Sequence, residues 1–136
     1  NEDGVEIRPI RELYNLQTVS TLESIIGFRY TGNPETIREI ILFATKHLGK
    51  AYDFDLDLTS DQAIYCSELV YKSLLHAGIG ISGTEWVAGR EMITPEALVR
   101  YMEQQCRAKG EFSWLFHITK SDHVISEHAF WDDHLR

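Results

Sequence analysis

The residue in this 136-residue sequence with the strongest case for chemistry is Cys66, which stands where a short apolar segment turns into a predicted helix. Apolar residues follow it at helical spacing, namely Leu69, Val70, Leu74 and Ala77. Gly78 then supplies the stop signal. Cys66 therefore falls in or just before the first helical turn, where unpaired N–H groups and the helix dipole stabilise a thiolate. This placement is typical of a nucleophile, and a small buried residue is an equally good interpretation.

The other candidate groups carry weaker signals. The spacing Asp53-x-Asp55-x-Asp57 invites a calcium site, but the loop lacks the glycine at position six and the glutamate at position twelve of an EF-hand. His47 falls in the last turn of a predicted helix, where a cation is favoured, so we interpret it as a helix-terminal residue. The histidines and acids of residues 121–136 lack a ligand pattern and are interpreted as solvated polar residues. The sequence thus predicts no metal and no cofactor.

Composition sets the class of protein. A hydrophobic content of 43% and a charged content of 25% are ordinary for a soluble single domain with its own core. The net charge of −8 argues against a nucleic acid as partner, and no run of about 18 apolar residues predicts a membrane span. Cys66 and Cys106 form no CxxC motif, and free thiols are the preferred interpretation, so the compartment stays open.

Caps and periodicity predict an α+β chain. Helices are expected at 33–48, 66–77 and 94–109, with Asn33 and Thr94 as N-caps and either Ser60 or Asp61 as a cap before the Cys66 helix. Cys106 should face the core from the third helix. Strands are expected at 4–8, 25–30 and 112–118, and residues 78–83 are expected to be a flexible stretch. Trp86, which follows, either lines a cleft or fills the core.

Two motifs resemble a known family. Gly49-Lys50-Ala51-Tyr52-Asp53-Phe54 and the later Tyr65-Cys66-Ser67-Glu68-Leu69-Val70 are similar to the nucleophile region of NlpC-type cysteine amidases, which are papain-like thiol hydrolases. The detail most resembles their circularly permuted, YiiX-like branch, whose Ile-Thr-Pro helix is matched by 92–98. The similarity runs from about residue 4 to residue 98. It implies a papain-like cysteine hydrolase fold of the permuted NlpC type, with an antiparallel sheet packed on helices and the nucleophile at a helix N-terminus.

The resemblance also implies roles for individual residues. Cys66 would be the catalytic nucleophile, and Tyr52 and Ser67 would contribute to the oxyanion or substrate site. In the permuted branch the catalytic histidine comes from a Gly-His-x-Gly-type segment that precedes the Gly-Val strand, and residues 1–136 contain no such motif. We therefore expect a single catalytic domain, 1–136, that lacks an N-terminal segment carrying the histidine strand. If the order were unpermuted, His117 or His123 would be the candidate.

The expected function is hydrolysis of an amide bond through a thioester on Cys66, with peptidoglycan peptides as substrate. An antibacterial effector, paired with an immunity or inhibitor protein, is one expected setting. One alternative is an amidase or acyltransferase acting on lipid N-acyl groups, and another is a non-catalytic module that binds peptides. The location is left open between the bacterial cytoplasm and, for a cell-wall hydrolase or secreted effector, the periplasm or exterior.

Overall fold

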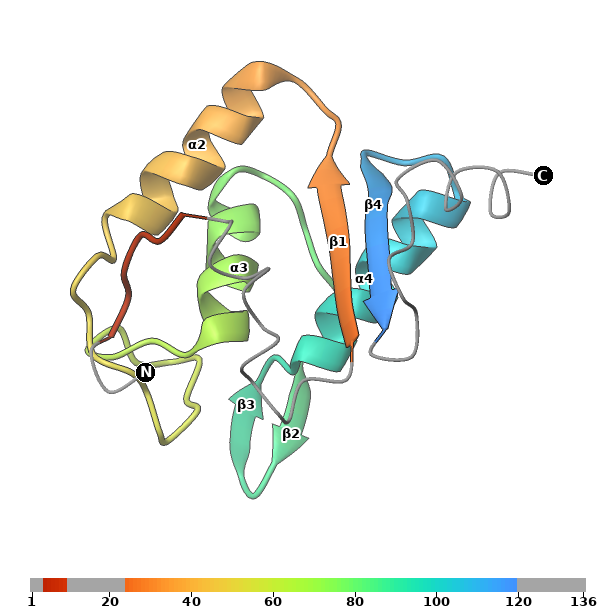
Figure 1. The fold of residues 1–136 in the computed structure, drawn as a ribbon. Coiled ribbons are helices and arrows are strands. Elements are labelled where there is room, and N and C mark those ends of the chain that lie inside the picture. Colours follow the sequence, from red (N-terminus) through yellow and green to blue (C-terminus); the bar gives the residue numbers. More distant parts are fainter. Residues whose placement is uncertain (1–3, 10–23, 120–136) are drawn as a thin grey trace.

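The computed structural model describes residues 4–9 and 24–119 of the chain (Figure 1). Three helices and four strands follow one another in the order β1 (Ser24–Tyr30), α2 (Pro34–Thr45), α3 (Cys66–His76), β2 (Glu85–Val87), β3 (Arg90–Met92), α4 (Pro95–Arg107) and β4 (Phe112–Thr119). The strands form two antiparallel pairs, β1 with β4 and β2 with β3. The predicted α+β class is therefore confirmed for the described part of the chain.

Side-chain caps fix where two of the helices begin. Asn33 accepts a hydrogen bond from the N–H of Thr36 at 2.8 Å, and Pro34 occupies the first position of α2. Thr94 caps α4 in the same way through the N–H of Ala97, at 3.2 Å. Helix α2 ends at Thr45, three residues before the predicted end, so His47 lies in the turn that follows the helix.

The end of α3 is set by glycine. Gly78 has a φ of 84°, which a residue with a side chain rarely adopts. Its N–H donates to Leu75 O at 3.0 Å, and the N–H of Ile79 donates to Leu74 O at 2.9 Å. This is the Schellman pattern of a helix C-terminus, and it turns the chain back towards the core at Ile79.

The larger sheet joins β1 to β4, two strands that lie far apart in the sequence. Their antiparallel register pairs Tyr30 with Phe112 and shifts between Gly27 and Phe28, which leaves a bulge in β4. An added Cβ at Gly27 would lie 2.7 Å from the ring of Phe116, so a larger residue there would have to displace that ring. The predicted strands at 25–30 and 112–118 are confirmed.

One local prediction was wrong, and one element was not predicted. Residues 4–9 form no strand, and Val5 only exchanges two backbone hydrogen bonds with the 49–50 turn, at 2.8 and 3.0 Å. The segment after residue 83, which we did not assign to strand, contains the hairpin of β2 and β3. Ala88 and Gly89 form its two-residue turn with φ angles of 53° and 83°, so both residues adopt the left-handed conformation of a tight hairpin.

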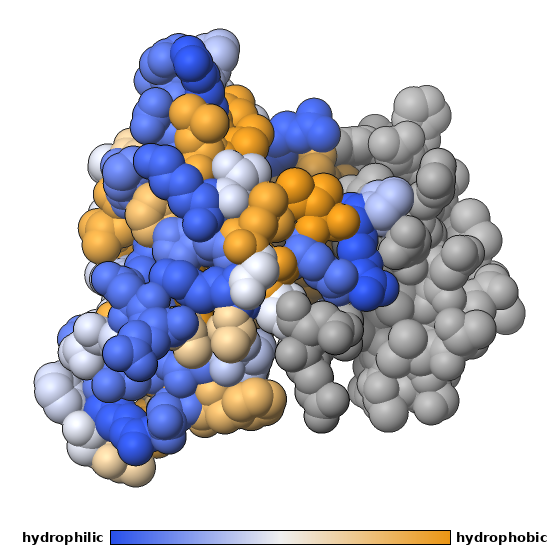
Figure 2. All heavy atoms as spheres, turned by 90° about the vertical axis from the view of Figure 1, so that its left-hand side faces the viewer, coloured by the Kyte–Doolittle hydropathy of each residue, from blue (hydrophilic) through white to orange (hydrophobic). Residues whose placement is uncertain are grey.

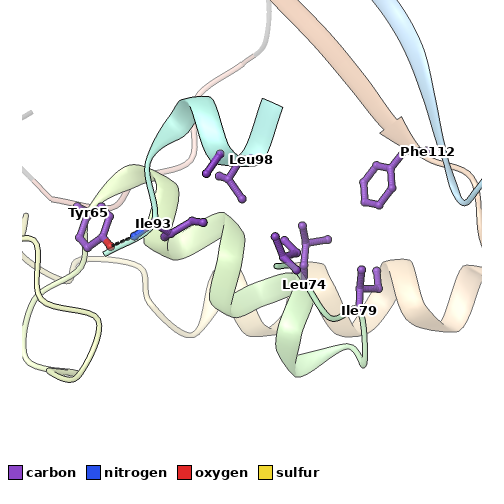
Figure 3. Close-up of a cluster of buried hydrophobic side chains, with 8 residues drawn as sticks. Tyr65, Leu74, Ile79, Ile93, Leu98 and Phe112 are labelled. Atoms are coloured by element: carbon purple, nitrogen blue, oxygen red, sulfur yellow. Dashed lines mark hydrogen bonds between the residues drawn. The ribbon is translucent and has the colours of Figure 1, made fainter. Parts of the chain in front are cut away.

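The core lies where α3, the start of α4 and the start of β4 meet (Figure 3). Ile93, which joins the hairpin to α4, is 0% exposed. The other buried residues of the cluster are Tyr65, Leu74, Ile79, Ile81, Ala97, Leu98 and Phe112. Cys106 is partly buried against the same cluster, as predicted. The core therefore holds the beginning of α3 directly against the beginning of α4.

The α2 side of the molecule is less buried than this core. Figure 2 views that side and shows hydrophobic patches set among hydrophilic side chains. Helix α2 contains no fully buried residue, and Ile41 is 56% exposed. Among the described residues, no helix is both long enough and apolar enough to cross a membrane.

Candidate active site

Cys66 is the first residue of α3 and its side chain is exposed to solvent. Tyr65, the preceding residue, has the extended backbone conformation of a helix N-cap. Its carbonyl receives the first helical hydrogen bond, from the N–H of Leu69 at 3.0 Å. The N–H groups of Cys66 and Ser67 precede that bond and have no acceptor within the helix, so they remain able to stabilise an anion beside the thiol.

Two side chains on either side of Cys66 hold this turn against the core. The Tyr65 hydroxyl accepts a hydrogen bond from the N–H of Ile93 at 3.0 Å, as drawn in Figure 3. The Ser67 hydroxyl donates to Ile93 O at 2.8 Å. Burial is the main cause that raises the pKa of Tyr65 above its ordinary value, so the phenol stays protonated. Both polar groups of the Ile93 backbone are thus satisfied by residues adjacent to the thiol.

Glu68 stabilises the same turn from within. Its side chain is 0% exposed, and its Oε2 accepts a hydrogen bond from the N–H of Tyr65 at 3.1 Å. This is the reciprocal half of a capping box, in which a glutamate at the third helical position binds the N-cap backbone. Ser60 and Asp61 were predicted as alternative caps, and this prediction was wrong because Glu68 makes the bond.

Lys72 neutralises the buried Glu68 carboxylate. Its Nζ lies 2.7 Å from Glu68 Oε1 and 2.8 Å from Asp61 Oδ1, and it donates to Ser60 O at 3.3 Å. Burial alone would lower the pKa of Lys72, but the contacts with Asp61 and Glu68 outweigh it and raise that pKa. The hydrogen bond from Lys72 lowers the pKa of Asp61. Lys72 therefore stays charged between one buried and one exposed carboxylate.

The Tyr52 segment lies beside the approach to Cys66. Ile64 N donates to Ala51 O at 3.0 Å and Asp53 N donates to Ile64 O at 3.3 Å, which makes a parallel bridge between Tyr52 and Ile64. The Tyr52 ring packs partly against the core and contacts the Phe54 ring at a centroid distance of 4.8 Å. The structure thus places Tyr52 against the residue two positions before the thiol.

The aspartates of this loop shape its turns. The buried Asp53 carboxylate accepts hydrogen bonds from the N–H groups of Asp55 and Asp57, at 2.8 and 2.9 Å. Asp57 in turn binds Thr59, and these hydrogen bonds lower the pKa of Asp57. Within residues 4–9 and 24–119, no group of three or more histidine, cysteine or acidic residues could hold a metal ion.

No histidine of the described residues is hydrogen-bonded to Cys66. His76 ends α3, about 15 Å along the helix at 1.5 Å per residue, and its ring contacts Phe43. Phe43 also contacts His47, whose Nδ1 lies 2.9 Å from Phe43 O. His117 is paired with Ile26 in the larger sheet. His123, the other histidine considered from the sequence, lies outside the described residues.

The second cysteine has a different environment. Cys106 lies in the last turn of α4 and is partly buried against the core. Burial raises the pKa of its thiol. Trp86, for which a cleft and the core were alternatives, is 75% exposed on the hairpin and does not fill the core.

Sequence reasoning thus found the thiol and its helix but missed the groups that hold them. Tyr65, Glu68, Lys72 and Ile93 had no predicted role at the site. A signal for two of them was present, because glutamate three positions after an N-cap is a capping-box pattern and lysine four positions later is a helical ion-pair spacing. The contacts to Ile93 bridge 26 and 28 residues and had no local signal.

Fold and site together define a small α+β protein that presents a solvent-exposed thiol at the start of a helix anchored in its core. The chain belongs to the C92 peptidase family of permuted papain-like amidases of the YaeF/YiiX type, whose family model matches residues 1–133. The suspected family is therefore confirmed over nearly the whole chain, and amide hydrolysis by a cysteine amidase or peptidase is the activity of that family. Neither a curated protein nor a solved structure matched the chain.

Proposed function

We propose that this protein hydrolyses an amide bond in peptidoglycan peptides, with Cys66 as the nucleophile. The observation that carries the proposal is the exposed thiol at the first position of α3, in a chain of the permuted amidase family. A thiol held in this position has the first-turn N–H groups of the helix beside it, and these are the donors that thiolate and oxyanion chemistry use.

The reaction runs in two halves. The Cys66 thiolate attacks the carbonyl carbon of the amide, the carbon–nitrogen bond breaks, and the amine leaves with a proton while a thioester forms. Water then attacks the thioester, releases the carboxylic acid and restores the thiol. The backbone N–H groups of Cys66 and Ser67 receive the developing oxyanion. The Ser67 hydroxyl is engaged with Ile93 O, so the contribution of Ser67 comes from its backbone.

Tyr52 completes the proposed substrate side of the site. Its bridge to Ile64 keeps its backbone beside the residue two positions before Cys66, and its ring is only partly covered by the core. The general base is a histidine outside the described residues. His123 is the candidate that the unpermuted order would use, and unchanged activity of a His123→Ala variant would favour the permuted order instead.

Incubation of the protein with purified stem peptides of peptidoglycan tests the proposal, with mass spectrometry to detect the addition of water. We expect cleavage by the wild-type protein and none by Cys66→Ala. Cleavage only of N-acylated lipid amides would replace the substrate by that of the enzymatic alternative. Tight binding of stem peptides without cleavage, equal in wild type and Cys66→Ala, would instead identify a binding module.

A further inference from the structure

The group that most needs an explanation beside the thiol is the Glu68 carboxylate. It is 0% exposed and two residues from Cys66. A buried carboxylate is costly unless it is paired, and an unpaired negative charge here would oppose a thiolate on Cys66. The structure provides one cation for it, Lys72, at 2.7 Å. A glutamine at this position would accept the same hydrogen bond from the Tyr65 N–H without a charge, so capping alone does not explain the buried ion pair.

We propose that Glu68 and Lys72 form a charge-balanced positioning pair for Cys66. Glu68 holds the N–H of Tyr65 and so fixes the backbone that leads into the thiol. Lys72 lies one helical turn further on and cancels the Glu68 charge, so the first turn of α3 keeps its affinity for an anion. The inference rests on the proposed role of Cys66 as nucleophile and adds two residues that act through the helix without contacting substrate.

The location of Lys72 supports this role. Its side chain is 17% exposed, while that of Asp61, its second partner, is 81% exposed. Lys72 is thus held between the buried carboxylate and solvent, and Asp61 and Ser60 O fix its ammonium group over Glu68. Loss of Lys72 would leave the buried Glu68 carboxylate without its cation, two residues after the thiol.

Removal of the charge at Glu68 and removal of the charge at Lys72 should therefore shift the pH midpoint of Cys66 alkylation in opposite directions. The test is the pH midpoint of Cys66 alkylation by iodoacetamide, followed by peptide mass spectrometry in the folded protein. Glu68→Gln keeps the capping bond and leaves Lys72 charged, so we expect a midpoint lower by roughly half a pH unit or more. Lys72→Met leaves Glu68 unpaired, so we expect a higher midpoint, and the double variant should return near wild type.

A control variant separates this shift in the midpoint from an effect of losing any ion pair on the surface. Arg38→Met breaks an exposed ion pair on α2 of similar type, to Glu35 at 3.4 Å, and should leave the midpoint unchanged. The other titratable groups near α3 and the loop before it remain the same in all variants. They are Lys50, Tyr52, Asp53, Asp55, Asp57, Asp61 and Tyr65 from the preceding segment, Glu39 and His47 from α2, Tyr71 and His76 from α3, Arg90 and Glu91 from the hairpin, and Tyr101 from α4.

The outcomes distinguish this inference from the proposed function. If wild-type Cys66 reacts no faster than a free thiol, the proposed nucleophile fails. If it reacts fast but the folded Glu68→Gln and Lys72→Met variants keep the wild-type midpoint, the positioning pair fails, and a uniform slowing at every pH has the same meaning. Should Lys72→Met not fold, the shift in Glu68→Gln and its reversal in the double variant decide the matter.

Discussion

The two cysteines occupy opposite ends of two helices that share one core. Cys66 begins α3 and is exposed, and Tyr65, Ser67 and Glu68 anchor the backbone around it. Cys106 lies in the last turn of α4 and is partly buried, where burial raises the pKa of its thiol. Buried side-chain hydrogen bonds hold the backbone on both sides of Cys66, whereas Cys106 packs against the core. A helix start favours a thiolate and a helix end does not, so the comparison favours Cys66 over Cys106 as the proposed nucleophile.

Replacement of each cysteine by alanine, which removes the sulfur atom, should give the largest difference between the two sites. Cys66→Ala should reduce amide hydrolysis by a factor of about 1,000 or more, because the nucleophile is lost. Its free energy of unfolding should change by less than about 0.5 kcal/mol, since the side chain is exposed. Cys106→Ala should keep the activity and lose about 1 kcal/mol of stability. The reverse pattern, with activity dependent on Cys106, would contradict the assignment.

The core beneath Cys66 provides the next largest effect. Ile93→Ala should lower the free energy of unfolding by about 2–5 kcal/mol, because it opens a cavity at a residue that is 0% exposed. Ile41→Ala on α2 makes the same chemical change at a residue that is 56% exposed and should cost less than about 1 kcal/mol. Chemical denaturation of both variants measures the difference, and equal losses would mean that the α2 side is as tightly packed as the α3–α4 contact.

The Tyr65 hydroxyl offers a smaller and more local test. Tyr65→Phe should cost about 1–3 kcal/mol of stability, because the buried N–H of Ile93 loses its acceptor. Tyr101→Phe is a matched control, since the hydroxyl of Tyr101 has no hydrogen bond within the described residues while its ring packs against the same core. Thermal or urea unfolding compares the two. Equal stability of both variants would show that the hydroxyl does not anchor the turn.

Alkaline pH should weaken the anchored end of α3. Lys72 and Tyr65 both have folded-state pKa values raised above their ordinary values of 10.5 and 10.0. A raised folded pKa means that the stabilising contribution is complete below the ordinary pKa and is lost as the pH rises through the folded value. Wild-type stability should therefore fall between pH 9 and about pH 11.5, and Lys72→Met should lose less over that interval. Parallel losses in urea unfolding at the two pH values would contradict this account.

Local signals predicted much of this fold. Asn33 and Thr94 are N-caps followed by proline, and Gly78 supplies a left-handed stop, so these helix ends depend on nearby residues alone. The hairpin of β2 and β3 was missed because its strands have three residues each and its Ala88-Gly89 turn lacks the common Asn-Gly signal. The strand at 4–8 was predicted from alternation, but Val5 makes only two hydrogen bonds with the 49–50 turn.

Only those features of the site that depend on residues close in the sequence could be predicted. Cys66 at a helix start follows from the apolar spacing after it, and the structure places it there. The anchoring by Ile93 could not be predicted, because it depends on how α3 and α4 pack rather than on any neighbour in the sequence. The Glu68–Lys72 pair lies between these cases, since its spacing is helical but its burial is a property of the fold.

The central claim, that the fold activates Cys66, is tested most directly by one comparison of rates. Iodoacetamide alkylation of Cys66 is measured at pH 7 in the folded protein and again in the urea-unfolded protein, with Cys106 followed in the same samples. The account predicts that folding accelerates the reaction of Cys66 and slows that of Cys106, because only the first thiol lies at a helix start. A Cys66 that reacts no faster in the folded protein than in the unfolded one would contradict it.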